Sequence, residues 1–302
     1  VRAFCGPTTW RIALTSKFAP GIGPSIMVPH PPLIVPQVGR GQEREIAPTT
    51  AAFECAARFV VDAQPDTVIV LSPHTTLYQD YFHISPGAGA SGDLARFGAR
   101  SVRFSVEYDQ ELAQVVAHAA DGDGFPAGTQ GERAPALDHG TMVPLYFLHQ
   151  AAGGTLPFRL VRVGLSGLSF AMHYQLGQRL AQAAQALERR VCVVASGDLS
   201  HYLQRTGPYG FRPEGPVYDA RVMDVMGRAA FDELLQFDEH ACETAGECGQ
   251  RSFLILAGCL DGRDVTAQAL SYQDVTGVGY GVCLFTPGEP NPARRFLDNK
   301  EA

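Results

Sequence analysis

The amino-acid sequence predicts a single α/β domain in which a mostly parallel central sheet is sandwiched by helices on both faces. Short apolar runs rich in β-branched residues recur along the chain, as in strands that are buried on both faces. Segments with apolar residues at helical spacing separate these runs, and such alternation is typical of a parallel sheet covered by helices. No linker-like stretch divides the 302 residues, which favours one domain over two.

The expected elements follow from these runs in chain order. Strands are expected at residues 25–28, 67–71, 81–84, 101–106, 158–163, 190–195 and 279–285. Helices are expected at residues 47–63, 109–120, 142–148, 169–187, 219–237 (a pair around Gly227) and 245–260. Gln64-Pro65 supplies a stop signal for the first helix, and Asp109 is a capping residue for the second.

The two ends of the chain differ in composition from its centre. Residues 1–24 hold the only tryptophan and finish in a run of Pro and Gly, so we expect a loosely ordered leader and regard Met27 as a candidate natural start. Residues 287–302 are polar and proline-rich, which is typical of a disordered tail. The compact domain is therefore expected over residues 25–286.

Composition excludes several classes of protein. The chain is 45% hydrophobic and 18% charged, so it can bury a sizeable core and is not wholly disordered. It has 24 basic and 31 acidic residues, and this net charge of −7 argues against a nucleic-acid partner. No apolar run reaches the roughly 20 residues of a membrane span, and no signal-peptide pattern opens the sequence. We therefore expect no membrane partner. The seven cysteines are irregularly spaced and form no CxxC pair, which favours reduced thiols, so we expect a cytoplasmic protein.

Three of the expected strands lead into a histidine, namely His30, His74 and His201. Sheets of this class bind ligands at the carboxyl ends of their strands, so we expect the three imidazoles to share one crevice. Prolines on both sides of His30, and Pro73 before His74, stiffen the backbone, which suits metal ligands. A histidine in an ordinary turn is the structural alternative for each. His139, ahead of an apolar helix, is a fourth candidate, although the aspartate before it also fits a helix cap.

A metal site also needs an anionic ligand, and residues 239–251 are rich in candidates. Glu247 is our first choice. It follows Gly246 and opens an apolar helix, where a carboxylate also stabilises the helix N-terminus. Glu243 and Cys248 remain the alternatives for this third ligand.

At these residues the sequence resembles the class III extradiol ring-cleavage dioxygenases of the LigB type. The resemblance covers nearly all of residues 26–286, and it is specific because six short motifs occur in the order found in that family. It looks closest to the branch associated with AMMECR1-like and radical-SAM proteins, and the Memo proteins are more distant relatives. The motifs are VPHPPLIVPQVGRG at 28–41, SPH at 72–74, YFHISPG at 81–87, LDHG at 137–140, SGDLSH at 196–201 and AGECGQRS at 245–252.

The resemblance implies a non-haem Fe(II) enzyme that opens catechol-type rings with O2. By position, His30 and His74 match the two histidine ligands of the iron, and Glu247 matches the carboxylate. Such a triad leaves up to three cis positions open on the metal for the diol and dioxygen. His201 matches the catalytic acid/base, a role for which an imidazole near neutrality is suited. His139 matches a histidine that faces the substrate or supports the ligands.

Two other functions remain open at this point. A Memo-like metal-binding or redox-modification protein without ring-cleavage activity would keep both histidines and use Cys248 with or instead of Glu247. A zinc hydrolase on the same histidines has less support, because the sequence lacks an HExxH helix and a GxSxG elbow. As protein partners we expect a second copy of the chain in a homo-oligomer, or a separate AMMECR1-like chain.

Overall fold

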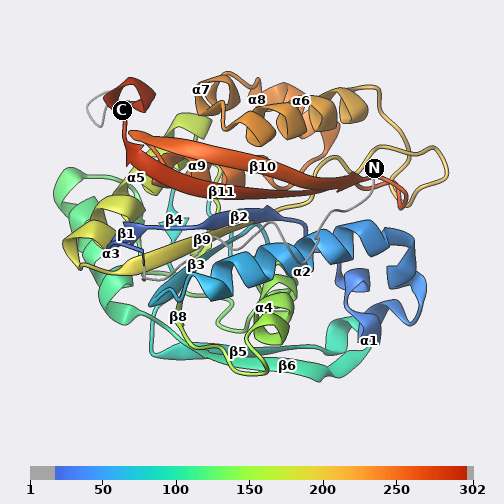
Figure 1. The fold of residues 1–302 in the computed structure, drawn as a ribbon, viewed down its shortest axis with the longest axis horizontal. Helices are drawn as coiled ribbons and strands as arrows, with labels where there is room; N and C mark the ends of the chain where they lie inside the picture. The colour runs from blue at the N-terminus through green and yellow to red at the C-terminus, as the bar shows by residue number, and fades with distance from the viewer. Residues whose placement is uncertain (1–17, 298–302) are drawn as a thin grey trace.

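The computed structural model describes residues 18–297, and its centre is a seven-stranded sheet (Figure 1). β2, β9, β3 and β8 are parallel to one another, and β1 adds a further parallel pairing to β9. β11 and β10 form an antiparallel pair at the other side of the sheet. The strand order is β10 (Arg263–Gln273), β11 (Tyr280–Pro290), β2 (Ser25–Val28), β9 (Arg190–Ser196), β3 (Thr67–Ser72) and β8 (Arg159–Gly164), with β1 (Gly21–Ile22) beside β9.

Helices cover both faces of this sheet, so the expected α/β sandwich is confirmed. Alternate side chains of the strands enter different cores. In β3, Ile69 and Leu71 join one core, whereas Val68 and Val70 join the other. The first core is covered by α3 (Gln110–Asp123), α5 (Phe170–Ala186), α6 (Glu214–Arg228), α7 (Phe231–Leu235), α8 (Glu239–Ala245) and α9 (Gln250–Cys259). The second is covered by α2 (Ala47–Asp62), α4 (His139–Ala151) and the hairpin of β5 (Gly89–Leu94) and β6 (Ala99–Glu107).

Figure 1 shows this layering, with α6, α7 and α8 on one side of the β10–β11 ribbon and α2 on the other. Three small elements complete the α-helices and strands of the described residues: α1 (Pro36–Gly39), β4 (Phe82–His83) and β7 (Ala127–Gly128). Within residues 18–297, none of the helices combines the length and the hydropathy that crossing a bilayer requires.

Five of the expected strands form the centre of the sheet with boundaries close to those predicted, and the differences lie elsewhere. Residues 81–84 give only the two-residue β4, and residues 101–106 lie in β6, outside the main sheet. β10 was not predicted because its sequence alternates polar and apolar residues and is only partly buried. The helix expected at 245–260 is α9 and begins only at Gln250, since Ala245 ends α8 and Gly246 after it adopts a left-handed conformation with φ of 68°.

The structure also differs from the expected ends of the domain. Gly21–Ile22 belong to the sheet as β1, since their backbone pairs with β9. β11 continues to Pro290 because β10 supplies a partner, and Phe296 and Leu297 pack against the core. Both segments lie in the parts that the sequence assigned to a leader (1–24) and a tail (287–302). Residues 1–17 and 298–302 lie outside the described residues.

Close contact between α5 and α9 gives a first testable prediction. A Cβ added to Gly258 of α9 would lie 1.9 Å from the carbonyl oxygen of Tyr174 in α5, so no side chain fits there. We expect Gly258→Ala to lower the free energy of unfolding by about 1–3 kcal/mol, measured by urea denaturation. Gly122→Ala in α3 is the control, because nothing lies within 4 Å of the added methyl group and alanine favours helix. Equal stability of the two variants would contradict the close packing of α5 against α9.

Candidate metal centre

The candidate site lies where three neighbouring parallel strands end. Val28 of β2 is in register with Ser196 of β9, and Leu71 of β3 is in register with Ala195, so these strands end at one edge. His30 and His74 each follow the last residue of their strand by two positions. This placement agrees with the prediction from the sequence that the two histidines meet where the strands end.

His30, His74 and Cys248 offer three ligand atoms that all lie within 4.8 Å of one another. The Nε2 atoms of His30 and His74 are 2.9 Å apart, and the sulfur of Cys248 is 3.7 Å from Nε2 of His30. Metal–nitrogen bonds of about 2.0–2.1 Å and a metal–sulfur bond of about 2.3 Å place bound ligand atoms roughly 3–3.6 Å apart. The donor set and its spacing therefore fit a single transition-metal ion.

The hydrogen bonds of His30 prepare its ring to bind a cation. The hydroxyl of Ser196 donates to the carbonyl oxygen of Gly140, so it accepts a hydrogen bond from Nδ1–H of His30. Nε2 of His30 then carries the free lone pair, on the side where His74 and Cys248 lie. Burial, with His74 nearby, lowers the pKa of His30 well below its usual value, and burial also lowers the pKa of His74. Both rings are thus neutral near pH 7, as metal ligands must be.

Cys248 is held in place by the turn that follows β9. Its backbone N–H donates to the carbonyl oxygen of Asp198, and the N–H of Asp198 donates to its sulfur at 3.3 Å. This approach requires glycine at position 197, since a Cβ there would lie 2.2 Å from Cα of Gly249. The side chain of Asp198 in turn accepts the backbone N–H of His30 at 2.8 Å. One carboxylate therefore links the loop of His30 to the loop of Cys248.

The sequence favoured Glu247 as the third ligand, but the structure groups Cys248 with the two histidines. The carboxylate of Glu247 accepts the backbone N–H of Gln250 at 2.6 Å, at the start of α9, and does not join the three-residue cluster. Burial raises the pKa of Glu247 to about 7. Glu243, the other carboxylate alternative, is exposed on α8. The physical reason is local. A carboxylate three residues before the first residue of a helix accepts hydrogen bonds from the free N–H groups there, whereas the next side chain, Cys248, faces the histidines.

His139 lies against both histidines of the cluster. Its ring stacks on His74, with ring centroids 3.9 Å apart, and its centroid is 5.5 Å from that of His30. Burial, with the neighbouring imidazoles, lowers the pKa of His139 to about 3, so the ring is neutral. Asp138 caps α4 and also accepts a hydrogen bond from Ser72, which fixes the start of this helix beside the end of β3.

His201 is held on a separate loop beside the cluster. Both its backbone N–H and its Nδ1–H donate to the carbonyl oxygen of Gly246, so Nε2 carries the lone pair. The exposed ring of Tyr209 meets His201 edge to face, with centroids 5.3 Å apart. His201 is not one of the three clustered ligand residues, which is consistent with an acid/base rather than a ligand.

Buried Asp219 fixes the loop of His201 and gives a pH prediction. It accepts the N–H of Ser200 and the hydroxyl of Tyr272, and burial raises its pKa to about 7 from an ordinary value of 3.8. Between pH 3.8 and about 7, Asp219 therefore keeps its proton in the folded protein but releases it in the unfolded chain. Its contribution to the free energy of unfolding is fully present below pH 3.8. The contribution is lost as the pH rises from there to about 7, at about 1.4 kcal/mol per pH unit.

Asp219→Asn should remove this pH dependence. In urea denaturation, the stability of the variant relative to the parent should rise between pH 5 and pH 7 and then stay constant. Exposed Asp121→Asn is the control and should show no such trend. A difference between the Asp219 variant and the parent that does not change with pH would contradict the raised pKa.

Several supporting residues were not predicted from the sequence. Ser196 and Ser72, which anchor His30 and Asp138, occur in the SGD and SPH motifs, but a serine at a strand end gives no specific signal. Asp219 lies 18 residues after His201, in a helix with no distinctive pattern. Cys248 was identified only as an alternative, since a lone cysteine in a long chain is most often a small apolar residue.

Comparison with known proteins defines the class of this chain. A family model described as the catalytic LigB subunit of aromatic ring-opening dioxygenase matches residues 24–283. The chain therefore belongs to the LigB family, as its motifs predicted. Among solved structures, an uncharacterized protein, JW3007 from Escherichia coli K12, shares the fold, with a TM-score of 0.54 and 15% identity over 87% of this chain and 99% of that one.

Curated relatives include both dioxygenases and Memo proteins. The chain is 34% identical over 263 residues to Protein CA_C1420 of Clostridium acetobutylicum, and the match covers 85% of this chain but only 56% of that protein. It is 29% identical over 209 residues to 3,4-dihydroxyphenylacetate 2,3-dioxygenase of Escherichia coli, covering 65% and 74% of the two chains. It is 25% identical over 239 residues to a MEMO1 family protein of Thermococcus onnurineus, covering 74% and 77%.

Proposed function

We propose that this protein is a ferrous ring-cleavage dioxygenase in which His30, His74 and Cys248 hold one Fe(II) ion. The convergence of these three ligand atoms within 4.8 Å, in a member of the LigB family, carries the proposal. The substrate would be a catechol-type aromatic diol, together with O2, as the name of the relative 3,4-dihydroxyphenylacetate 2,3-dioxygenase suggests. Bound iron would supply the redox coupling between the diol and dioxygen.

His201 would act as the acid/base of this reaction. Its Nδ1–H is committed to the carbonyl oxygen of Gly246, so the free Nε2 is available to take a proton from a diol hydroxyl and return it later. His139 would line the site as a neutral ring, since its pKa of about 3 keeps it uncharged. An uncharged His139 ring suits a diol substrate whose hydroxyl groups lose protons only beside the base and the metal.

An assay of the reconstituted protein tests this function. The protein is loaded with Fe(II) under anaerobic conditions, mixed with a panel of catechols and exposed to O2, and the yellow ring-opened product is followed by absorbance. We expect product and oxygen uptake in equal amounts. Oxygen uptake without ring opening across the panel would contradict a ring-cleavage activity.

A second candidate function, a Memo-like metal or redox protein without ring cleavage, is favoured specifically by Cys248. A thiolate is a softer ligand than a carboxylate and suits metals such as Cu(I) as well as iron. A protein with this second function would bind metal at His30, His74 and Cys248 but give no ring-opened product. Oligomerisation, or association with a separate AMMECR1-like chain, stays part of the proposal; a relative is named as the beta subunit of a 2-aminophenol 1,6-dioxygenase of Pseudomonas.

A further inference from the structure

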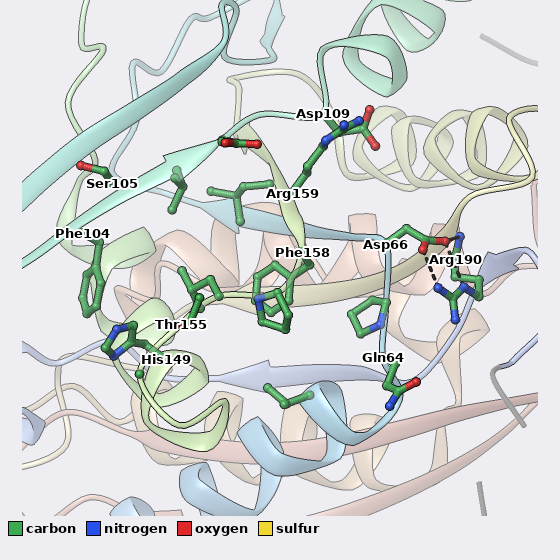
Figure 2. A pocket seen from close by; sticks show the side chains of 18 of the residues that line it. Gln64, Asp66, Phe104, Ser105, Asp109, His149, Thr155, Phe158, Arg159 and Arg190 are labelled. Atoms are coloured by element: carbon green, nitrogen blue, oxygen red, sulfur yellow. Dashed lines mark hydrogen bonds and ion pairs between the residues drawn. The ribbon is translucent and has the colours of Figure 1, made fainter. Parts of the chain in front are cut away.

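A cavity of about 1140 Å³ opens at the opposite edge of the sheet from the candidate metal centre (Figure 2). Its lining includes Asp66, Arg159 and Arg190, which lie at the amino ends of β3, β8 and β9. The metal-binding histidines follow the carboxyl ends of the strands, and a six-residue strand is about 20 Å long. The cavity is therefore a separate feature that the proposed reaction does not use.

One wall of this cavity is a strand edge without a partner among residues 18–297. β6 pairs with β5 only, and five consecutive residues of β6, 103–107, line the cavity. The N–H of Tyr108 donates to Ala88 on the β5 side, whereas the next N–H, of Asp109, donates to Leu160 of β8. Backbone groups alternate in direction along a strand, so those of Arg103, Ser105 and Glu107 point away from β5 into the cavity.

The cavity lies where one further strand would fit between β6 and the segment that leads into β8. β6 meets β8 at the bridge between Tyr108 and Leu160, and the two chains diverge from that point. Residues 154–159, which lead into β8, form the opposite wall. Figure 2 shows Phe104 and Ser105 on the β6 side, Thr155 and Phe158 on the facing segment, and the Asp66–Arg190 ion pair at the other end. An extended segment inserted here would lie between β6 and the start of β8.

Side chains give the cavity an apolar floor and a basic rim. Phe104, Val106, Leu156 and Phe158 are partly buried and pack on the core beneath. Arg103 and Arg159 are exposed, and neither guanidinium group makes a hydrogen bond or ion pair with another described residue. In contrast, Arg190 is paired with Asp66, and Arg189 is paired with Asp109. This excess of unpaired positive charge occurs on a chain whose net charge is −7.

We propose that this cavity binds an extended acidic segment of a partner protein, which adds as a strand to the free edge of β6. Main-chain hydrogen bonds to residues 103, 105 and 107 would supply affinity, as in other cases of strand addition. Alternate apolar side chains would cover the floor at Phe104 and Phe158. Acidic side chains on the other face would meet Arg103 and Arg159, and this charge complementarity selects the partner.

A labelled seven-residue peptide of alternating Glu and Val is the probe for this site. Fluorescence polarisation should show saturable binding to the intact protein below about 1 mM, and the matched peptide with Lys in place of Glu should not bind. In hydrogen exchange followed by NMR, the peptide should slow exchange of the N–H groups of Arg103, Ser105 and Glu107. If peptide binding leaves the metal content of the protein unchanged, the two sites are separate.

Matched variants separate backbone pairing from charge. Ser105→Pro removes one N–H on the free edge and should weaken peptide binding about tenfold, whereas Ser105→Ala should not. Arg103→Glu should also weaken binding about tenfold, whereas Arg100→Glu, on β6 but outside the cavity lining, should not. Glu107→Gln removes a lining carboxylate that has no partner among residues 18–297, so it should tighten binding about threefold.

Three outcomes would overturn the proposal. The first is no saturable binding of the acidic peptide. The second is binding that is insensitive to both Ser105→Pro and Arg103→Glu, measured on variants whose circular dichroism matches that of the parent. The third is protection of the β6 edge that grows with protein concentration in the absence of peptide, which would identify the edge as a contact between two copies of this chain.

Discussion

Replacing Cys248 with serine should remove tightly bound metal from the protein. The sulfur of Cys248 is one of three ligand atoms clustered within 4.8 Å, and a hydroxyl is a far weaker ligand for a soft or borderline cation. Loss of a residue that merely supports a ligand typically lowers metal affinity 10–100-fold, so loss of a ligand should lower it about a hundredfold or more. Metal per chain, measured by plasma emission after anaerobic loading and desalting, should fall from about one to near zero.

Two further variants distinguish the alternatives for the third ligand. Glu247→Gln keeps a side-chain acceptor for the N–H of Gln250, so this variant should fold and retain its metal. Glu243→Gln, on the exposed side of α8, should also retain metal. Metal loss in Glu247→Gln, with full loading of Cys248→Ser, would instead restore the carboxylate ligand expected from the family resemblance.

Replacing His201 with asparagine should abolish turnover without removing the metal. The amide of asparagine can still donate to the carbonyl oxygen of Gly246, so the loop should keep its position. Asparagine has no basic nitrogen in place of Nε2, and loss of a general acid/base typically costs about 10²–10⁴-fold in rate. We therefore expect kcat for ring opening to fall by that factor, with metal content and the Kd for the catechol nearly unchanged.

His118→Asn is the matched control, because His118 is an exposed histidine of α3 away from the cluster. It should retain full activity. If His201→Asn empties the metal site, His201 is a ligand and the assignment of roles is wrong. If the variant keeps most of its activity, another group moves the proton.

Much of the fold could be predicted because its strands are buried on both faces. The apolar runs that became β2, β3 and β9 are readable since both alternating sets of side chains enter a core. β10 lacks this signal because it is an edge strand with one exposed face, and its pairing with β11 depends on contacts distant in the sequence. The β5–β6 hairpin was recognised only in part for the same reason.

The two histidines of the candidate site could be predicted, whereas the third ligand could not. Position in the strands places His30 and His74 at one edge of the sheet, and this inference needs only topology. Residues 247 and 248 are adjacent, so topology places both near the site. Which of them faces the histidines depends on the left-handed Gly246 and on the contact between Gly197 and Gly249, and these are tertiary details.

X-ray absorption at the iron edge of the anaerobic ferrous protein tests the central claim most directly. If His30, His74 and Cys248 hold the ion, the spectrum should contain one sulfur neighbour at about 2.3 Å together with imidazole nitrogens at about 2.0–2.1 Å. Cys248→Ser should lose the sulfur neighbour. A spectrum of the parent protein with only nitrogen and oxygen neighbours would contradict the proposed centre.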